Sequence, residues 1–169
     1  MWVWDIALST WVVQLQTVLI LVECHFMGNN KKILIVDDNA DIRRGYQVIL
    51  TAHHYDTFVA SDASSSLAAA DAHKPDLIIL DLGLPAGPGS DSTLPLPEPS
   101  GGFLVLERLT ADSNLALIPV VVVSGLDPKA NRRRAIQGGA MAFVEKPSDQ
   151  EQLLGIIGQL LGSPQILTH

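Results

Sequence analysis

Residues 74–85 read KPDLIILDLGLP, and this stretch decides the fold. Its unbroken apolar run, Leu77 to Leu80, begins soon after a proline and stops at Asp81. A short apolar run bounded in this way predicts a strand that is buried on both faces, as in a parallel sheet. Open α/β sheets bind their ligands beyond the carboxyl ends of such strands, so Asp81 is a candidate site residue.

Similar apolar runs recur on both sides of this stretch and alternate with helical patterns. The predicted strands span residues 33–36, 55–60, 118–123 and 141–144, and the predicted helices span 40–52, 62–72, 102–110, 128–137 and 149–161. Strict alternation of strands with helices predicts a parallel sheet covered by helices on both faces. Right-handed crossovers then leave few topologies.

The composition narrows the classes of function. The chain has 169 residues, 47% of them hydrophobic, which suits one domain with additional segments. Its formal net charge of -7 argues against direct binding to nucleic acid, since phosphate backbones require a basic face. Cys24 is the single cysteine, so no disulfide can form within the chain, and a reducing setting fits. We therefore expect a cytoplasmic protein.

Three segments depart from the regular alternation. Residues 1–30 hold all three tryptophans, residues 86–101 are rich in Pro, Gly and Ser, and residues 162–169 form a short tail. We therefore expect one domain over residues 31–161, with a loop insertion at 86–101.

The segment 1–30 has three interpretations. It is a mis-assigned start or loosely packed extension, with Met27 as the natural first residue; an anchor at a membrane; or a helix that docks on this domain or on a partner. Its stretch 6–22 approaches the roughly 17–25 residues that a membrane span needs, but polar residues interrupt it. Membrane contact is therefore expected only if residues 1–30 insert.

Ionic and polar residues follow four of the predicted strands. Asp37 and Asp38 follow the first strand, Asp81 the third, Ser124 the fourth and Lys146 the fifth. Because the carboxyl ends of parallel strands share one edge of a sheet, we expect these residues to converge. Carboxylate oxygens suit Mg²⁺, a lysine can pair with a phosphate, and an aspartate can accept a phosphoryl group.

Five short motifs occur in order at the predicted strand ends. They are Asp37-Asp38, Asp81 with Pro85 four residues on, Ser124-Gly125, Phe143 three residues before Lys146, and Lys146-Pro147. Together they resemble the receiver domain of two-component response regulators, over about residues 31–161. The resemblance implies a five-stranded parallel sheet in a flavodoxin-like (βα)5 three-layer sandwich, with strand order 2-1-3-4-5.

The resemblance also implies a role for each matched residue. Asp81, Lys146 and Ser124 are expected to carry the chemistry, with Asp81 as the phosphoryl acceptor. The expected Mg²⁺ ligands are all oxygen donors near the strand ends: Asp37 (mostly through water), Asp38, Asp81 and the carbonyl of Gly83.

The remaining implied roles concern the phosphoryl group and the response to it. Ser124, Gly125 and Lys146 are expected to contact the phosphoryl oxygens. Ser124 and Phe143 are the expected switch: Ser124 swings towards the phosphoryl group and Phe143 turns inward behind it. The peptide bond before Pro147 is expected to be cis.

The implied function is that of a single-domain response regulator. A histidine kinase or histidine phosphotransfer protein donates the phosphoryl group, and the switch relays the signal to an unknown downstream protein. Such a domain is a Mg²⁺-dependent phosphoryl acceptor, able to dephosphorylate itself, rather than a conventional enzyme. Gly83 and Leu126 stand where the family tunes dephosphorylation, and neither has a polar side chain to orient water. We therefore expect a long-lived phosphoryl state.

Other functions fit parts of the pattern. A receiver fold can work as a protein-interaction module without phosphorylation. A phosphatase with an aspartate nucleophile usually carries a second acid two residues later, where this chain has Gly83. The triplet Arg132-Arg133-Arg134 predicts a solvated helix face, or alternatively a docking patch on the face through which the family often signals.

Overall fold

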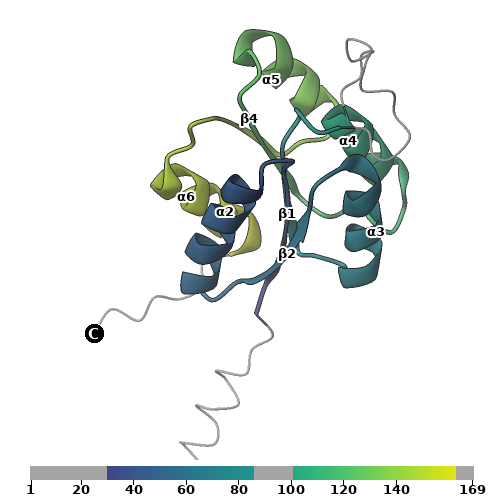
Figure 1. Ribbon diagram of the computed structural model, residues 1–169. Coiled ribbons are helices and arrows are strands. Elements are labelled where there is room, and N and C mark those ends of the chain that lie inside the picture. The colour runs from purple at the N-terminus through teal and green to yellow at the C-terminus, as the bar shows by residue number, and fades with distance from the viewer. Residues whose placement is uncertain (1–29, 86–100, 163–169) are drawn as a thin grey trace, which may run out of the picture. The chain divides into compact units, whose positions relative to one another are not determined.

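The computed structural model describes residues 30–85 and 101–162 of the chain (Figure 1). The predictions for the N-terminal segment, the loop insertion and the tail fall on residues 1–29, 86–100 and 163–169, and lie outside the described residues. Among the helices of the two described ranges, none combines the length and the apolar character needed to cross a membrane.

Five strands alternate with five helices along the described residues. In chain order they are β1 (Lys32–Val36), α2 (Ala40–Ala52), β2 (Asp56–Ala60), α3 (Ala63–His73), β3 (Leu77–Leu80), α4 (Gly101–Ala111), β4 (Val120–Ser124), α5 (Pro128–Gln137), β5 (Ala142–Glu145) and α6 (Gln150–Leu161). The strands pair in parallel in the order β2-β1-β3-β4-β5. The predicted parallel sheet and its flavodoxin-like strand order are confirmed.

The sheet carries a separate apolar layer on each face, as Figure 1 shows from the helices on its two sides. Helices α2 and α6 cover one face, where Leu50 and Ile157 pack with Ile79 of β3. Helices α3, α4 and α5 cover the other face, where Leu106 packs in one cluster with Leu80 of β3. Successive strand residues point to opposite faces, so β3 contributes to both layers and is buried along its whole length.

Four of the five strands differ slightly from their predicted bounds. Strand β1 begins at Lys32 rather than at residue 33, and β2 begins at Asp56 rather than at residue 55. Strand β4 begins at Val120 rather than at residue 118, because Pro119 has no N–H for the ladder and the Ile118 N–H donates to the Leu115 carbonyl instead. Strand β5 begins and ends one residue later than predicted. None of these differences moves a predicted site residue away from the carboxyl edge of the sheet.

The first turn of α4 lies directly against the end of β3. The helix begins at Gly101, one residue earlier than predicted. A Cβ atom at Gly102 would lie 2.4 Å from the Asp81 carbonyl oxygen and from the Leu82 Cα, closer than real Cβ atoms approach. Glycine at this position therefore allows α4 to begin beside the strand that carries Asp81.

Candidate functional site

The residues at the carboxyl ends of β1, β3, β4 and β5 converge at one edge of the sheet. Backbone hydrogen bonds hold neighbouring strand ends together at this edge. The Asp81 N–H donates to the Val36 carbonyl at 2.8 Å, and the Lys146 N–H donates to the Ser124 carbonyl at 2.9 Å. The strand ends that carry the acids, the serine and the lysine therefore lie side by side, as expected.

Lys146 forms a bridge between two carboxylates. Its Nζ donates to Asp37 Oδ2 at 2.5 Å and to Asp81 Oδ2 at 2.8 Å. The side chains are 17%, 3% and 10% exposed for Lys146, Asp37 and Asp81, so these ion pairs are largely shielded from water. Burial acts to lower the pKa of Lys146, but the hydrogen bonds and charges of the two carboxylates outweigh it, so the pKa lies above its ordinary value. At neutral pH the site therefore holds an ammonium ion.

Three carboxylates gather beside this ammonium. One oxygen from each of Asp37, Asp38 and Asp81 lies within 4.8 Å of the others. Asp37 and Asp81 are buried, whereas Asp38 is exposed. Clustered hard oxygen donors that are partly open to solvent fit a Mg²⁺ ion, which usually keeps several waters in its coordination shell.

Asp37 is held by groups that the sequence analysis did not single out. Its Oδ1 accepts the Asn39 N–H at 2.9 Å, and its carbonyl oxygen accepts Arg43 Nη1 at 2.6 Å. Arg43 lies one helical turn after Asn39, the residue that caps α2. That spacing was the available signal, because it directs a side chain back towards the start of the helix.

Asp81 and its neighbour Gly83 form a tight local turn. The Gly83 N–H donates to Asp81 Oδ1 at 3.2 Å, while Oδ2 accepts Lys146. Both oxygens of the predicted acceptor therefore have a donor. The role of the Gly83 carbonyl as a metal ligand stays a prediction.

Ser124 lies at the same edge, but its hydroxyl is turned towards the loop after β4. The side chain is buried, and its Oγ accepts the Leu126 N–H at 3.2 Å. The next residue, Gly125, lies beside Lys146: a Cβ placed on it would be 3.9 Å from the Lys146 Cβ. The predicted phosphate contacts are thus adjacent in space, and their role stays a prediction.

Phe143 lies outside the polar cluster, in the apolar layer between the sheet and helices α3 to α5. The guanidinium carbon of Arg132 is 5.1 Å from its ring centroid, and that of Arg134 is 4.0 Å from the ring centroid of Phe103. The expected solvated helix face is confirmed, since all three arginines of the triplet are exposed, but Arg132 and Arg134 also make contacts that were not predicted. Their long side chains lie over aromatic rings, which sequence spacing alone does not reveal.

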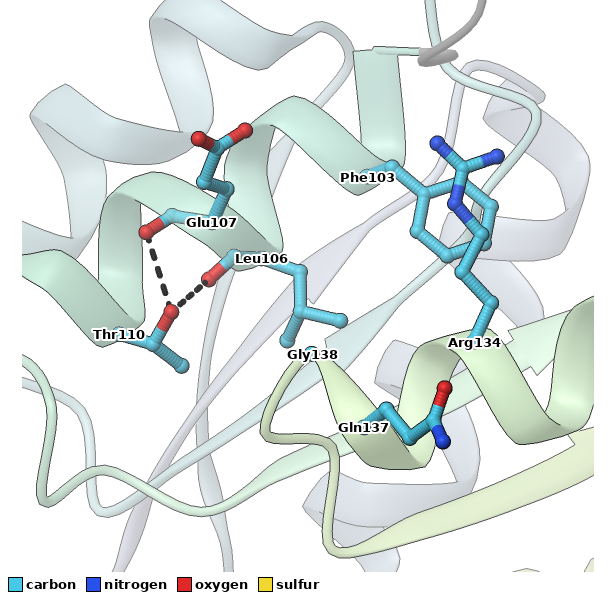
Figure 2. Close-up of a pocket in the computed structure, with 7 residues that line it drawn as sticks. All are labelled: Phe103, Leu106, Glu107, Thr110, Arg134, Gln137 and Gly138. Carbon is cyan, nitrogen blue, oxygen red and sulfur yellow. Dashed lines mark hydrogen bonds between the residues drawn. The ribbon is translucent and has the colours of Figure 1, made fainter.

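Several cavities lie on the described surface, and two of them matter for the acid cluster and for α5. The first, of about 450 Å³, borders the acid cluster and is lined by Ile42, Gly45, Tyr46, Ile49, Lys146, Pro147, Ser148 and Gln150. The Tyr46 hydroxyl and the Ser148 hydroxyl are 2.8 Å apart and join α2 to the loop after β5, where the Lys146-Pro147 bond is cis as expected. The second, of about 300 Å³, lies between α4 and α5 (Figure 2) and contains none of the strand-end residues.

Comparisons with known proteins identify the family. A family model for the response regulator receiver domain matches residues 33–158. Response regulator PleD of Caulobacter vibrioides is 33% identical over 129 residues, which make up 76% of this chain and 26% of PleD. Polar-differentiation response regulator DivK of Brucella anthropi is 30% identical over 132 residues, 78% of this chain and 97% of DivK. The chain thus spans about a quarter of PleD but nearly all of DivK.

The fold also matches solved structures. The receiver domain of sensor histidine kinase PA1611 from Pseudomonas aeruginosa has a TM-score of 0.66 and 20% sequence identity, over 79% of this chain and 99% of that one. At this identity the likeness shows the fold alone. In the PA1611 structure a magnesium ion is coordinated in the active-site cleft.

Proposed function

We propose that this chain, which belongs to the response regulator receiver family, accepts a phosphoryl group on Asp81 through a domain at residues 31–161. Receiver domains are phosphoryl acceptors rather than conventional enzymes. The observation that carries the proposal is the bridge from Lys146 to the carboxylates of Asp37 and Asp81, at 2.5 and 2.8 Å. It supports Asp81 as the acceptor because a cation stands beside the carboxylate that receives an anionic group.

The proposed reaction is an in-line displacement on phosphorus. A carboxylate oxygen of Asp81 forms the new O–P bond while the P–N bond of a phosphohistidine breaks. The imidazole leaves with the bonding electron pair and takes up a proton from solvent. Lys146, whose ammonium now pairs with Asp81, turns to pair with the phosphoryl oxygens as they approach.

The acid cluster fits the Mg²⁺ ion that receiver domains bind. We assign as ligands Asp37, Asp38 and Asp81, whose oxygens gather within 4.8 Å, together with the Gly83 carbonyl. These oxygens would hold the ion, and the positive charge that it would supply there would offset the negative charge on the transferring group.

The phosphodonor is a protein that presents a phosphohistidine, either a histidine kinase or a phosphotransfer protein. The cavity beside Lys146 supports this choice because it is lined mainly by apolar side chains, such as Ile42 and Ile49, and opens next to the acid cluster. Such a surface suits a docking partner that must bring its histidine up to Asp81.

The signal leaves through Ser124 and Phe143 to a downstream protein. The Ser124 hydroxyl now accepts the Leu126 N–H, at the start of the loop that leads into α5. When Ser124 turns towards a phosphoryl group it releases Leu126, and the loop gains freedom to move. Phe143 packs inward in the phosphorylated state, which shifts a two-state equilibrium at the docking face.

Labelling by acetyl phosphate tests the acceptor assignment. We expect Mg²⁺-dependent incorporation of one phosphoryl group into the wild-type chain, and loss of incorporation in Asp81→Asn. Asp71→Asn is the matched control, because Asp71 is an exposed carboxylate on α3 that forms a surface ion pair with Lys74 at 2.6 Å, on a helix away from the strand ends. Labelling that persists in Asp81→Asn would place the acceptor elsewhere.

The alternative function is an interaction module that works without phosphorylation. It predicts that wild type and Asp81→Asn bind the downstream protein with equal affinity, with or without acetyl phosphate. The proposed switch predicts that only the phosphorylated wild type gains affinity. Pull-down with the two proteins under both conditions separates the two functions.

A further inference from the structure

Helix α5 buries little of its own surface, and two of its arginine side chains add to its contacts with the domain. All of its residues are described, and Ala135 is the one that is buried. Two of its arginines contribute further contacts by lying over aromatic rings, Arg132 over Phe143 and Arg134 over Phe103. Figure 2 shows the guanidinium of Arg134 over its ring. Both distances, 5.1 and 4.0 Å, lie within the roughly 6 Å of a cation–π contact.

A carboxylate on β5 orients the first of these arginines. Glu145 Oε1 lies 3.3 Å from Arg132 Nη2. Glu145 is two residues after Phe143 on the same strand, so both side chains lie on the same face of the sheet. An exposed ion pair contributes little energy by itself, but this one directs the guanidinium over the ring. Phe143 is 5% exposed beneath it, which is the inward position.

The same helix is connected to the other member of the proposed switch. Ser124 Oγ accepts the Leu126 N–H, and the Asp127 side chain, one residue later, caps α5 by accepting the Lys129 N–H at 3.0 Å. A rotation of Ser124 therefore acts on the start of α5. Arg132, one turn further along, transmits the position of α5 to Phe143.

We infer that Arg132 is a positioning residue for phosphorylation, which holds Phe143 inward before a phosphoryl group arrives. The inference rests on the proposed function, in which the phosphorylated state has Phe143 inward. Coupling between two sites is reciprocal, so a residue that favours the inward ring also raises the affinity of the Asp81 site for a phosphoryl group. Removal of Arg132 releases Phe143 and weakens that affinity.

Binding of beryllofluoride with Mg²⁺, a non-covalent analogue of the aspartyl phosphate, measures this effect in the full chain. We expect Arg132→Ala to weaken the affinity by about two- to fivefold, the range that an exposed cation–π contact corresponds to. Arg132→Lys keeps a cation that can lie over the ring and should recover part of the loss.

Two neighbouring arginines provide matched controls. Arg133→Ala removes the same charge from the same helix, and Arg134→Ala removes a cation–π contact to Phe103, which is not part of the switch. Both should bind the analogue like wild type, although Arg134→Ala should lower the unfolding midpoint. Equal affinity of Arg132→Ala and wild type would overturn the inference. An equal loss in Arg134→Ala would also overturn it, since the effect would then be a general loosening of α5.

A readout without the analogue separates this inference from the proposed function. The chain has four phenylalanines, so para-fluorophenylalanine gives four fluorine signals, and Phe143→Leu identifies the one of interest. That signal should move towards its solvent-exposed value in Arg132→Ala but not in Arg133→Ala. An unmoved signal overturns the inference. If the signal moves but wild type does not bind beryllofluoride, the proposed function fails while the contact between Arg132 and Phe143 stands.

Discussion

Lys146→Met tests whether the bridge at the strand ends holds the site together. The substitution keeps the length of the side chain but removes the ammonium, and so leaves the carboxylates of Asp37 and Asp81 without their nearest cation. Because those side chains are 3% and 10% exposed, solvent cannot replace the lost charge. Removal of one partner from a buried ion pair typically costs about 3–5 kcal/mol, a large part of the stability of a domain.

Urea unfolding at neutral pH measures the loss. With a slope of about 2 kcal/mol per molar urea, the midpoint should fall by roughly 2 M. Neutral pH is suitable because the pKa of Lys146 is raised in the folded state. Such a lysine stabilises the fold fully below its unfolded-state pKa of about 10.4, and this stabilisation is lost only as pH rises through the higher folded-state pKa. At neutral pH the experiment therefore compares the charged lysine with methionine.

A second ion pair provides the control. Lys31 pairs with Asp76 at 2.8 Å, but the two side chains are 51% and 31% exposed. Lys31→Met should therefore cost at most about 1 kcal/mol. In an Asp81→Asn background, Lys146→Met should cost about 1.5–3 kcal/mol less than in wild type, because one charged hydrogen bond is already absent. A cost that is equal in both backgrounds, or no greater than that of Lys31→Met, would refute the reasoning.

Two further predictions concern the phosphoryl lifetime and the acid limit of stability. Since Gly83 and Leu126 offer no side chain that orients water, phosphate bound to Asp81 should persist for minutes after the phosphodonor is removed, and a decay within seconds would contradict this expectation. Burial acts to raise the pKa of Asp76, but Lys31 and the Lys32 N–H outweigh it and hold the pKa below its ordinary value. The ionised Asp76 therefore contributes to the free energy of unfolding above its unfolded-state pKa, and this contribution is lost as pH falls through its folded-state pKa. Asp76→Asn should therefore lower the thermal midpoint at neutral pH by the equivalent of about 1 kcal/mol, with the difference from wild type shrinking below about pH 4.

The parts of the site that local patterns could predict are those that depend on strand ends. Apolar runs that stop at Asp37, at Asp81 and just before Glu145-Lys146 predict both the strands and their carboxyl edge, because burial on two faces requires continuous apolar residues. Parallel pairing then places these residues side by side whatever their separation along the chain. Resemblance to a family supplied the strand order that alternation alone left open.

Contacts between side chains from different elements were beyond local patterns. Arg43 contacts the Asp37 carbonyl only because of the way in which α2 packs on the sheet. In the same way, Arg132 lies over Phe143 because of the packing of α5. The arginine triplet shows the limit most clearly, because its spacing is that of a solvated surface while two of its members cover aromatic rings. Long flexible side chains choose among many conformations, and only the surrounding packing selects one.

By itself, the sequence determined the alternation of strands and helices, the carboxyl edge at which the site lies, and the residues that reach it, because burial and hydrogen-bonding periodicity are local properties of the chain. Only the tertiary structure decided that Lys146 bridges Asp37 and Asp81, that the Ser124 hydroxyl is turned to Leu126, and that Phe143 lies beneath Arg132. These contacts join groups that are far apart in the chain, and their geometry depends on the packing of several elements at once.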